Sequence, residues 1–135
     1  MVVYDEIPLS TKSRTEWIDI TSSVQRVISS SGISRGICMV SSLHTTSGLT
    51  INENADPDVG RDFFYKLNKM VDRDPQFRHA EGNSDSHIKA SLVGFSVQIP
   101  ITDKLLVLGT WQSVYFCEFD GPRSSRRCSV TVIGE

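Results

Sequence analysis

The stretch FSVQIPITDKLLVLGTWQSVYFCEF, residues 95–119, is the most informative part of the chain about fold class. It holds three short apolar runs rich in β-branched and aromatic residues, and Asp103 with Lys104 separates the first two runs as a turn. A fourth run of the same kind, CSVTVIGE, ends the chain at residue 135. Short strands that follow one another through short connections pair as antiparallel hairpins. This half of the chain therefore predicts a mainly antiparallel sheet.

The first half of the chain mixes strands with helices. Apolar runs bounded by turn residues predict strands over residues 14–21, 35–44 and 48–54. Caps and three- to four-residue apolar spacing predict helices over residues 21–32, 55–71 and 86–94, the last capped by Ser84 or Asp85. Because helices interrupt a series of hairpin-like strands, we expect an α+β fold, a mainly antiparallel sheet or sandwich with two to three helices.

Two of these helices carry recognisable N-terminal signals. Asp56 is placed as the N-cap of the second helix, with Pro57 at its first helical position. In the first helix Ser22 and Gln25 have the spacing of a capping box. Both helix starts are therefore predicted from local sequence alone.

Composition favours a single globular domain over residues 1–135, with 39% hydrophobic and 22% charged residues. A net charge of −2 argues against a nucleic-acid-binding surface spread over the whole protein. The chain has no run of about 18 consecutive apolar residues and no signal-peptide pattern at its start, so we expect a cytoplasmic protein without a membrane anchor. The three cysteines form no Cys-x-x-Cys pair and are expected to be buried, reduced thiols.

Two predicted strands each place a carboxylate at the end of an apolar line. Alternation puts Leu49, Ile51 and Glu53 on one strand face, and Phe116 and Glu118 on one face of another strand. A carboxylate taken out of water needs a partner, a proton or a metal ion, since its desolvation is costly. Glu53 and Glu118 are therefore candidate catalytic groups. The alternative is that both lie where strand ends meet water.

The three histidines, His44, His79 and His87, all lie in polar segments at or near the ends of predicted elements. Three imidazoles can hold a metal ion and leave one position open, as catalytic zinc sites do. His87 falls in the first turn of the third helix, where a positive charge is disfavoured, so its neutral form is favoured. Their spacing matches no standard zinc pattern, and three surface histidines are the alternative.

Further polar residues suit anion binding and a substrate pocket. Arg123 follows the turn in EFDGPRSSRR, residues 118–127, and with Lys89 is a candidate for binding phosphate or carboxylate; a solvated basic loop is the alternative. Trp111 and Gln112 are candidate pocket residues, the ring packing against a substrate and the amide orienting it. A Trp111 that belongs to the core is an equally good interpretation of the same residues.

Four motifs in order, HTTSGLTINENADPDV, RHAEGNSDSHIKASLVG, GTWQSVYFCEFDGPR and VTVIGE, closely resemble the YjbQ family, also called UPF0047. The resemblance runs from about Trp17 to Glu135 and implies a small α+β protein that assembles as a homotrimer. It also implies a cluster of three histidines able to hold a metal ion. Matched residue by residue, this cluster and its surroundings fall on His44, His79 and His87, on the acidic positions Glu53, Asp56 and Glu118, and on the turn arginine Arg123.

The activity associated with this family is a secondary thiamine-phosphate synthase activity, in which a pyrimidine pyrophosphate is joined to a thiazole phosphate with loss of pyrophosphate. Carboxylates suit Mg²⁺ on pyrophosphate, whereas imidazoles suit Zn²⁺, so we expect this transferase reaction as a side activity. The resemblance thus implies a metal-dependent enzyme, with Zn²⁺ or Mg²⁺, acting on a small phosphorylated or anionic substrate. The alternative is a non-catalytic trimeric ligand-binding protein whose polar cluster is structural.

Overall fold

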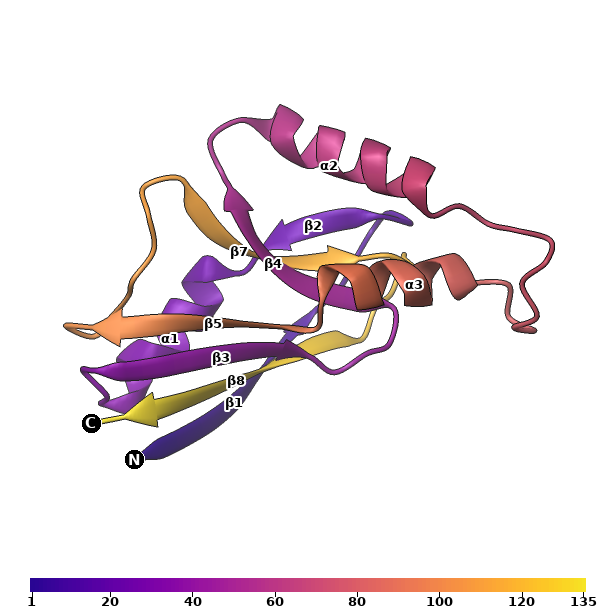
Figure 1. Ribbon diagram of the computed structural model, residues 1–135. Helices are drawn as coiled ribbons and strands as arrows, with labels where there is room; N and C mark the ends of the chain where they lie inside the picture. The colour runs from indigo at the N-terminus through magenta and orange to yellow at the C-terminus, as the bar shows by residue number, and fades with distance from the viewer.

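Two antiparallel sheets make up the centre of the molecule in the computed structural model, which describes residues 1–135. One sheet has five strands in the order β1-β8-β3-β5-β6, and the other has three in the order β2-β7-β4 (Figure 1). The strands are β1 Val2–Leu9, β2 Glu16–Asp19, β3 Gly36–Ser42, β4 Ser47–Glu53, β5 Ser96–Thr102, β6 Leu105–Leu106, β7 Gln112–Glu118 and β8 Arg126–Gly134. The expected α+β class is confirmed.

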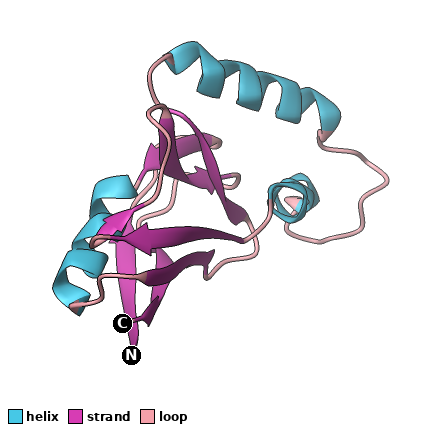
Figure 2. Ribbon diagram, turned by 60° about the vertical axis from the view of Figure 1, so that its left-hand side comes forward, coloured by secondary structure: helices cyan, strands magenta, loops and turns pink.

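Three helices, α1 Thr21–Ser31, α2 Pro57–Met70 and α3 Ser84–Val93, pack on different sides of these sheets (Figures 1 and 2). Helix α1 lies on the inner face of the five-stranded sheet, where Val24 and Ile28 join the main core. Helices α2 and α3 cover the outer face of the three-stranded sheet, where Leu67 and Ala90 pack against Phe119. None of the three helices combines the length and apolar character that crossing a membrane requires.

The outer face of the five-stranded sheet carries apolar side chains that no helix covers. The register aligns Val2, Ile133 and Ile37 in one row across three strands, and Tyr4 and Met39 in the next row. All five side chains are exposed. Contiguous apolar surface of this kind usually marks a site of association.

Some local predictions are wrong in detail. Helix α1 has Ile20 at its N-cap and no side-chain cap, so the predicted capping box of Ser22 and Gln25 does not form. Instead, the Gln25 side chain donates to the Lys104 carbonyl and accepts from the Leu106 amide. These partners are about 80 residues away in sequence, so no local pattern identifies them. The N-terminal strand β1 is a further element that the sequence pattern does not predict.

Other local predictions are confirmed. The Asp56 side chain accepts a hydrogen bond from the Asp58 amide at 2.9 Å, and Pro57 begins α2. The cysteines Cys38, Cys117 and Cys128 are buried and free. Burial raises the pKa of the Cys117 thiol to about 12, which keeps it protonated and inert.

Gly60 lets α2 approach the three-stranded sheet closely. A Cβ at Gly60 would lie 2.7 Å from the Trp17 ring, which is itself stacked on Tyr115 with ring centroids 4.1 Å apart. We expect Gly60→Ala to lower the free energy of unfolding by about 1–2 kcal/mol, because overpacking of about 1–3 kcal/mol exceeds the gain of about 1 kcal/mol in helix propensity. Urea unfolding measures this change. The exposed Asp62→Ala on the same helix is the control, and a Gly60→Ala variant more stable than the wild type would contradict the expectation.

Candidate functional site

His44 lies just after β3 and is held by backbone contacts on both sides. Its own amide donates to the Ser42 hydroxyl at 3.1 Å. Its Nε2 accepts a hydrogen bond from the Arg127 amide, at the start of β8, at 3.0 Å. The ring is therefore fixed between two strands that are neighbours in the five-stranded sheet.

The contact with the Arg127 amide determines the protonation state of His44. Because Nε2 accepts a hydrogen bond, its lone pair is occupied and the single proton of the neutral ring is assigned to Nδ1. Burial lowers the pKa of His44, the charges of Arg126 and Arg127 lower it further, and Glu118 partly opposes them. At neutral pH His44 is thus an uncharged ring with Nδ1–H as its free donor.

A pocket of about 370 Å³ lies beside this ring, between the turn that leads into β4 and helix α3. It is lined by His44, His87 and a set of small polar and apolar groups: Thr45, Ser47, Ala90, Ser91, Gly94 and Phe95. The tight packing of α3 on β4 shapes this pocket, because the Gly94 carbonyl accepts from the Leu49 amide at 3.1 Å. Two imidazoles and three hydroxyls therefore line one hollow.

His79 lies in a neighbouring hollow of about 410 Å³ that has His87 as a shared wall. The His79 and His87 ring centroids are 5.2 Å apart, with the rings nearly perpendicular. The Nε2 atom of His79 also lies 4.0 Å from a carboxylate oxygen of Glu81. The three histidines thus lie along one strip of surface, with His87 in the middle.

This arrangement does not complete a metal site within one chain. No group of three His, Cys, Asp or Glu side chains is placed to hold an ion. His79 and His87 form a close pair, but the Nε2 lone pair of His44 already accepts from the Arg127 amide. Protein zinc sites need at least three side-chain ligands with free lone pairs. The donors of one chain therefore do not fit the implied metal ion.

Glu118 is fully buried in the centre of a hydrogen-bond network. Arg126 donates to both of its carboxylate oxygens, with Nε 2.8 Å from Oε2, and the Thr11 hydroxyl and Asp120 amide also donate to it. Burial by itself would raise the pKa of Glu118, but these hydrogen bonds and the Arg126 charge outweigh it and lower the pKa. The structure thus surrounds Glu118 with the partners of a permanently ionised, structural carboxylate.

The candidate anion-binding residues Arg123 and Lys89 are placed differently. Arg123 is half exposed and donates to the buried Asp120 carboxylate at 2.8 Å. Lys89 is buried, and its Nζ donates to the side-chain oxygen Oδ1 of Asn68 at 2.7 Å. Burial lowers the pKa of Lys89, against the opposing charge of Asp85. Of the two candidates, only Arg123 reaches solvent.

Sequence reasoning missed the residues that anchor α3 under the pocket. The Arg14 side chain bridges Asp120 at 2.8 Å and Asp85 at 3.3 Å, and it donates to the Ser86 hydroxyl at 3.0 Å. Asn83 donates to Asp120 at 2.7 Å. Arg14 precedes β2 in an unremarkable polar segment, so only its position in three dimensions identifies this role.

Glu53, Asp56, Trp111 and Gln112 lie at the other end of β4. Glu53 pairs with Gln112 in the β4–β7 register, and the Asn54 amide donates to the Trp111 carbonyl at 2.8 Å. At about 3.3 Å per residue, the seven residues of β4 separate Glu53 from the histidine end by about 20 Å. One chain therefore does not bring these residues to the histidines.

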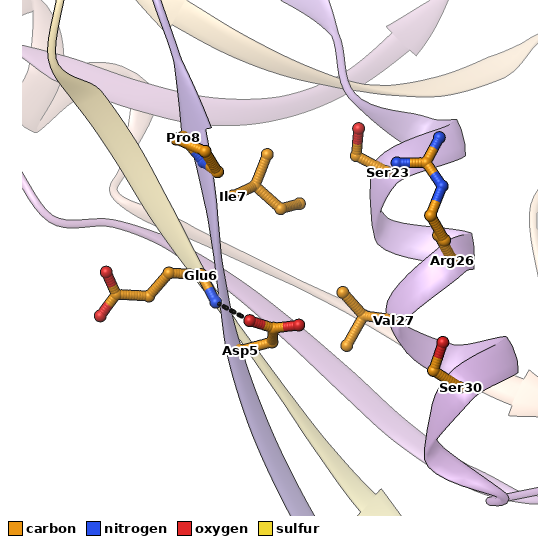
Figure 3. A pocket seen from close by; sticks show the side chains of 8 residues that line it. All are labelled: Asp5, Glu6, Ile7, Pro8, Ser23, Arg26, Val27 and Ser30. Atoms are coloured by element: carbon orange, nitrogen blue, oxygen red, sulfur yellow. Dashed lines mark hydrogen bonds between the residues drawn. The ribbon is translucent and has the colours of Figure 1, made fainter.

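Other hollows lack the predicted residues. The groove of about 380 Å³ between β1 and α1 is lined by Ser23, Arg26 and Ser30 from the helix and by Asp5 from the strand (Figure 3). Asp5 accepts a hydrogen bond from the Glu6 amide at 2.8 Å, as the dashed line in Figure 3 shows. No histidine or predicted site residue lines this groove, so the His44–His87 pocket is the better candidate.

Comparisons with known proteins agree on one family. The model of the UPF0047 protein YjbQ-like family matches residues 5–135. UPF0047 protein YugU of Bacillus subtilis is 43% identical over 129 residues, covering 95% of this chain and 97% of the relative. A UPF0047 protein of Methanocaldococcus jannaschii is 47% identical over 127 residues, covering 94% and 91%.

Solved structures show the same architecture. An uncharacterized conserved protein of the yjbq/upf0047 family from Clostridium acetobutylicum has a TM-score of 0.92 at 50% identity, covering 96% of this chain and 99% of that one. A YbjQ-like protein of unknown function from Sulfolobus solfataricus has a TM-score of 0.95 at 32% identity, covering 100% and 99%.

Proposed function

Because this chain belongs to the UPF0047 protein YjbQ-like family, and because His44 and His87 line a polar pocket, we propose that it is an enzyme acting on a small phosphorylated or otherwise anionic substrate. The observation that carries the proposal is the fixed His44 ring, whose Nδ1–H is left as a donor beside the pocket. A positioned, neutral donor suits a phosphate or pyrophosphate oxygen, since a hydrogen bond to a charged group is worth about 1.5–3 kcal/mol.

Each pocket residue has a distinct role in this proposal. His44 donates through Nδ1–H to an anionic oxygen but cannot act as a base, because its only lone pair accepts from the Arg127 amide. The Thr45 hydroxyl supplies a further donor. The Ser91 hydroxyl already donates to the His87 carbonyl at 3.0 Å, and that of Ser47 is paired with Ser42. His87 is the acid–base group, since it lines the same pocket. Arg123, which is half exposed, adds a positive charge at the surface.

The resemblance is the only support for the proposed reaction class. A thiamine-phosphate synthase-like transfer releases pyrophosphate, and an anion-binding pocket would bind the pyrophosphate end of such a substrate. In this proposal His87 supplies a proton to the leaving oxygen, and His44 holds that group in place. The transfer remains a side activity of the proposed enzyme, not its defining reaction.

Two further properties implied by the resemblance stay proposals. A divalent ion, Zn²⁺ or Mg²⁺, would need ligands in addition to the His79–His87 pair, so the roles above use no metal ion. Assembly as a homotrimer is supported by the exposed apolar row of Val2, Ile37 and Ile133 on the uncovered sheet face. Elemental analysis measures the metal content, and light scattering measures the oligomeric state.

A non-catalytic ligand-binding protein is the second candidate, and one observation favours it. Three polar residues, Glu118, Asp120 and Lys89, are buried and already paired. A polar cluster of this kind holds a fold together without taking part in chemistry. The two candidates share anion binding and differ in turnover, so turnover distinguishes them.

Titration with inorganic pyrophosphate tests the proposed pocket. We expect His44→Ala to weaken pyrophosphate binding by about tenfold or more, because one hydrogen bond to a charged group is lost. We expect the same loss of affinity in a Thr45→Ala, His87→Ala double variant. Isothermal titration calorimetry measures both, and circular dichroism checks that each variant is folded.

Ser30→Ala, in the groove between β1 and α1, is the matched control and should bind pyrophosphate as the wild type does. Equal affinity in the wild type and in His44→Ala would refute the pocket as the anion site. Complementation of a strain that lacks thiamine-phosphate synthase separates the two candidates. Rescue by the wild type but not by His87→Ala supports an enzyme, whereas binding without rescue supports the non-catalytic protein.

A further inference from the structure

Strand β1, at one edge of the five-stranded sheet, has the longest open edge in the molecule. It spans eight residues, Val2–Leu9, and pairs only with β8. The other edges are shorter or covered: β6 has two residues and β2 has four, and on β4 the Leu49 amide donates to the Gly94 carbonyl beside α3 at 3.1 Å. An open edge offers unpaired amides and carbonyls to any extended chain, so a long one needs protection.

The ladder between β1 and β8 determines which backbone groups of β1 face the open edge. Met1 and Gly134 exchange two hydrogen bonds, at 2.9 and 3.1 Å, and the register then runs without interruption from Val2 to Leu9. In an antiparallel pair, residues that exchange two such bonds alternate with residues that exchange none. The amides and carbonyls of residues 2, 4, 6 and 8 therefore point away from β8.

Two of these four positions offer no free donor. Pro8 has no backbone N–H. The Glu6 amide donates to Oδ1 of Asp5 at 2.8 Å, the bond drawn in Figure 3. The amides of Val2 and Tyr4 stay free, at the very start of the strand. An incoming strand thus finds donors over residues 2–4 and none over residues 5–9.

Asp5 occupies a position that favours an apolar residue. Its neighbours on the same line of β1, Val3, Ile7 and Leu9, all pack with the main core. In Figure 3 the Asp5 carboxylate lies on the side of β1 that faces α1, whereas the Glu6 side chain points away. Asp5 forms no ion pair, although Arg26 lines the same groove. Aspartate is also poorly suited to strands, so packing and strand propensity do not account for it.

Pairing at this edge would extend the apolar face of the sheet. Val2, Ile133 and Ile37 are exposed and lie in one row that ends at β1. A strand added to β1 would continue this row onto a second copy of the chain. The joined apolar surface would then favour further association.

We propose that Asp5 and Pro8 close the open edge of β1 against strand pairing with further copies of this chain. An inward-pointing charge and a proline are both features that protect edge strands. Pro8 removes a donor without breaking the ladder, because its nitrogen faces away from β8. This closure is independent of the function proposed for the His44–His87 pocket. It also implies that an apolar residue at position 5 maintains or raises stability while it promotes association.

The double variant Asp5→Val, Pro8→Val tests the closure. It frees the Glu6 amide, adds an amide at position 8 and places a valine on the core-facing line. At equal concentration and temperature, we expect its light scattering and thioflavin T fluorescence to rise several-fold faster than those of the wild type. Asp5→Val alone should unfold at a urea concentration no lower than that of the wild type, so that lost stability does not explain the association.

Thr131→Val is the matched control, because it adds a valine to β8, whose backbone pairs with β1 on one side and β3 on the other. It should associate no faster than the wild type. Asp5→Asn keeps a side-chain oxygen that accepts from the Glu6 amide, so it should associate more slowly than Asp5→Val. A double variant that associates no faster than Thr131→Val overturns the proposal.

Amide hydrogen exchange of the wild-type protein tests the Asp5 cap without any substitution. After correction for intrinsic rates, the Glu6 amide should exchange several-fold more slowly than the Tyr4 amide, because only the first has an acceptor. Equal exchange of the two amides would overturn the role of Asp5, whatever the variants do.

Discussion

Arg126→Met is expected to lower the free energy of unfolding by about 3–5 kcal/mol at pH 7, because it leaves the Glu118 charge buried without its partner. Arg126 and Glu118 are both nearly inaccessible to water, at 6% and 0% exposure of their side chains. Losing the pair therefore costs far more than losing a surface ion pair, which is worth about 0–1 kcal/mol. Urea unfolding followed by circular dichroism measures the change.

The pH dependence of this variant is expected to differ in sign from that of the wild type. In the wild type the pKa of Glu118 is lowered, so its contribution to stability is present above the unfolded pKa and is lost as the pH falls through the folded pKa. In Arg126→Met, burial without the arginine raises the pKa, so protonation relieves the penalty in acid. The stability difference between the two proteins should therefore begin to shrink above about 4.3, the usual pKa of glutamate, as the variant takes up its proton. It should go on shrinking below that pH, as the wild type loses the contribution of Glu118.

Two controls accompany this measurement. Arg127→Met removes an exposed pair with Glu6 and should cost less than about 1 kcal/mol. The double variant Arg126→Met, Glu118→Leu removes both charges and should recover most of the lost stability, since apolar replacement of a whole buried pair is often neutral. If Arg126→Met is no less stable than Arg127→Met, the pair does not stabilise the fold.

Phe119→Ala is expected to cost about 3–5 kcal/mol, the usual range for a buried phenylalanine. Its side chain is fully buried under α2 and α3, where it packs with Leu67, Ala90 and Cys117. The Phe119 carbonyl also accepts from the Ser86 hydroxyl at 2.6 Å, which ties the start of α3 to the three-stranded sheet. Because α3 carries His87, we expect a looser α3 to weaken pyrophosphate binding as well.

Phe95→Ala is the matched control for this cavity, since that ring is 64% exposed. It should change the free energy of unfolding by no more than about 0.5 kcal/mol. Both variants are compared by thermal and urea unfolding. Equal costs for the two substitutions would mean that Phe119 does not hold the helices on the sheet.

Local sequence was enough wherever neighbouring residues satisfy one another. Asp56 caps α2 through an amide two residues away, and Pro57 supplies a backbone angle suited to a helix start. The alternating apolar residues of β4 and β7 form the core line that the pattern predicts. The cap joins residues that are close in sequence, and the strands follow a two-residue alternation of apolar side chains. Both features can be recognised in the sequence, so the sequence is sufficient to predict the fold class.

Distant contacts decided what each polar residue does. Glu53 and Glu118 have the same sequence signature, a carboxylate ending an apolar line, yet only Glu118 lies against an arginine, because β8 runs past β7 with Arg126 at its start. Gln25 fits a capping box but is hydrogen-bonded to Lys104 and Leu106, at the edge strand β6. Pairings of this kind depend on which strands meet, so the order of residues does not specify them.

Residue patterns alone specify the α+β fold, the start of α2 and the set of polar residues from which the site is built. Three-dimensional packing is what brings His44 and His87 to one pocket and leaves Glu53 at the far end of β4. The difference arises because side-chain patterns record burial and local capping, whereas a site depends on the register and crossing of elements far apart in the chain.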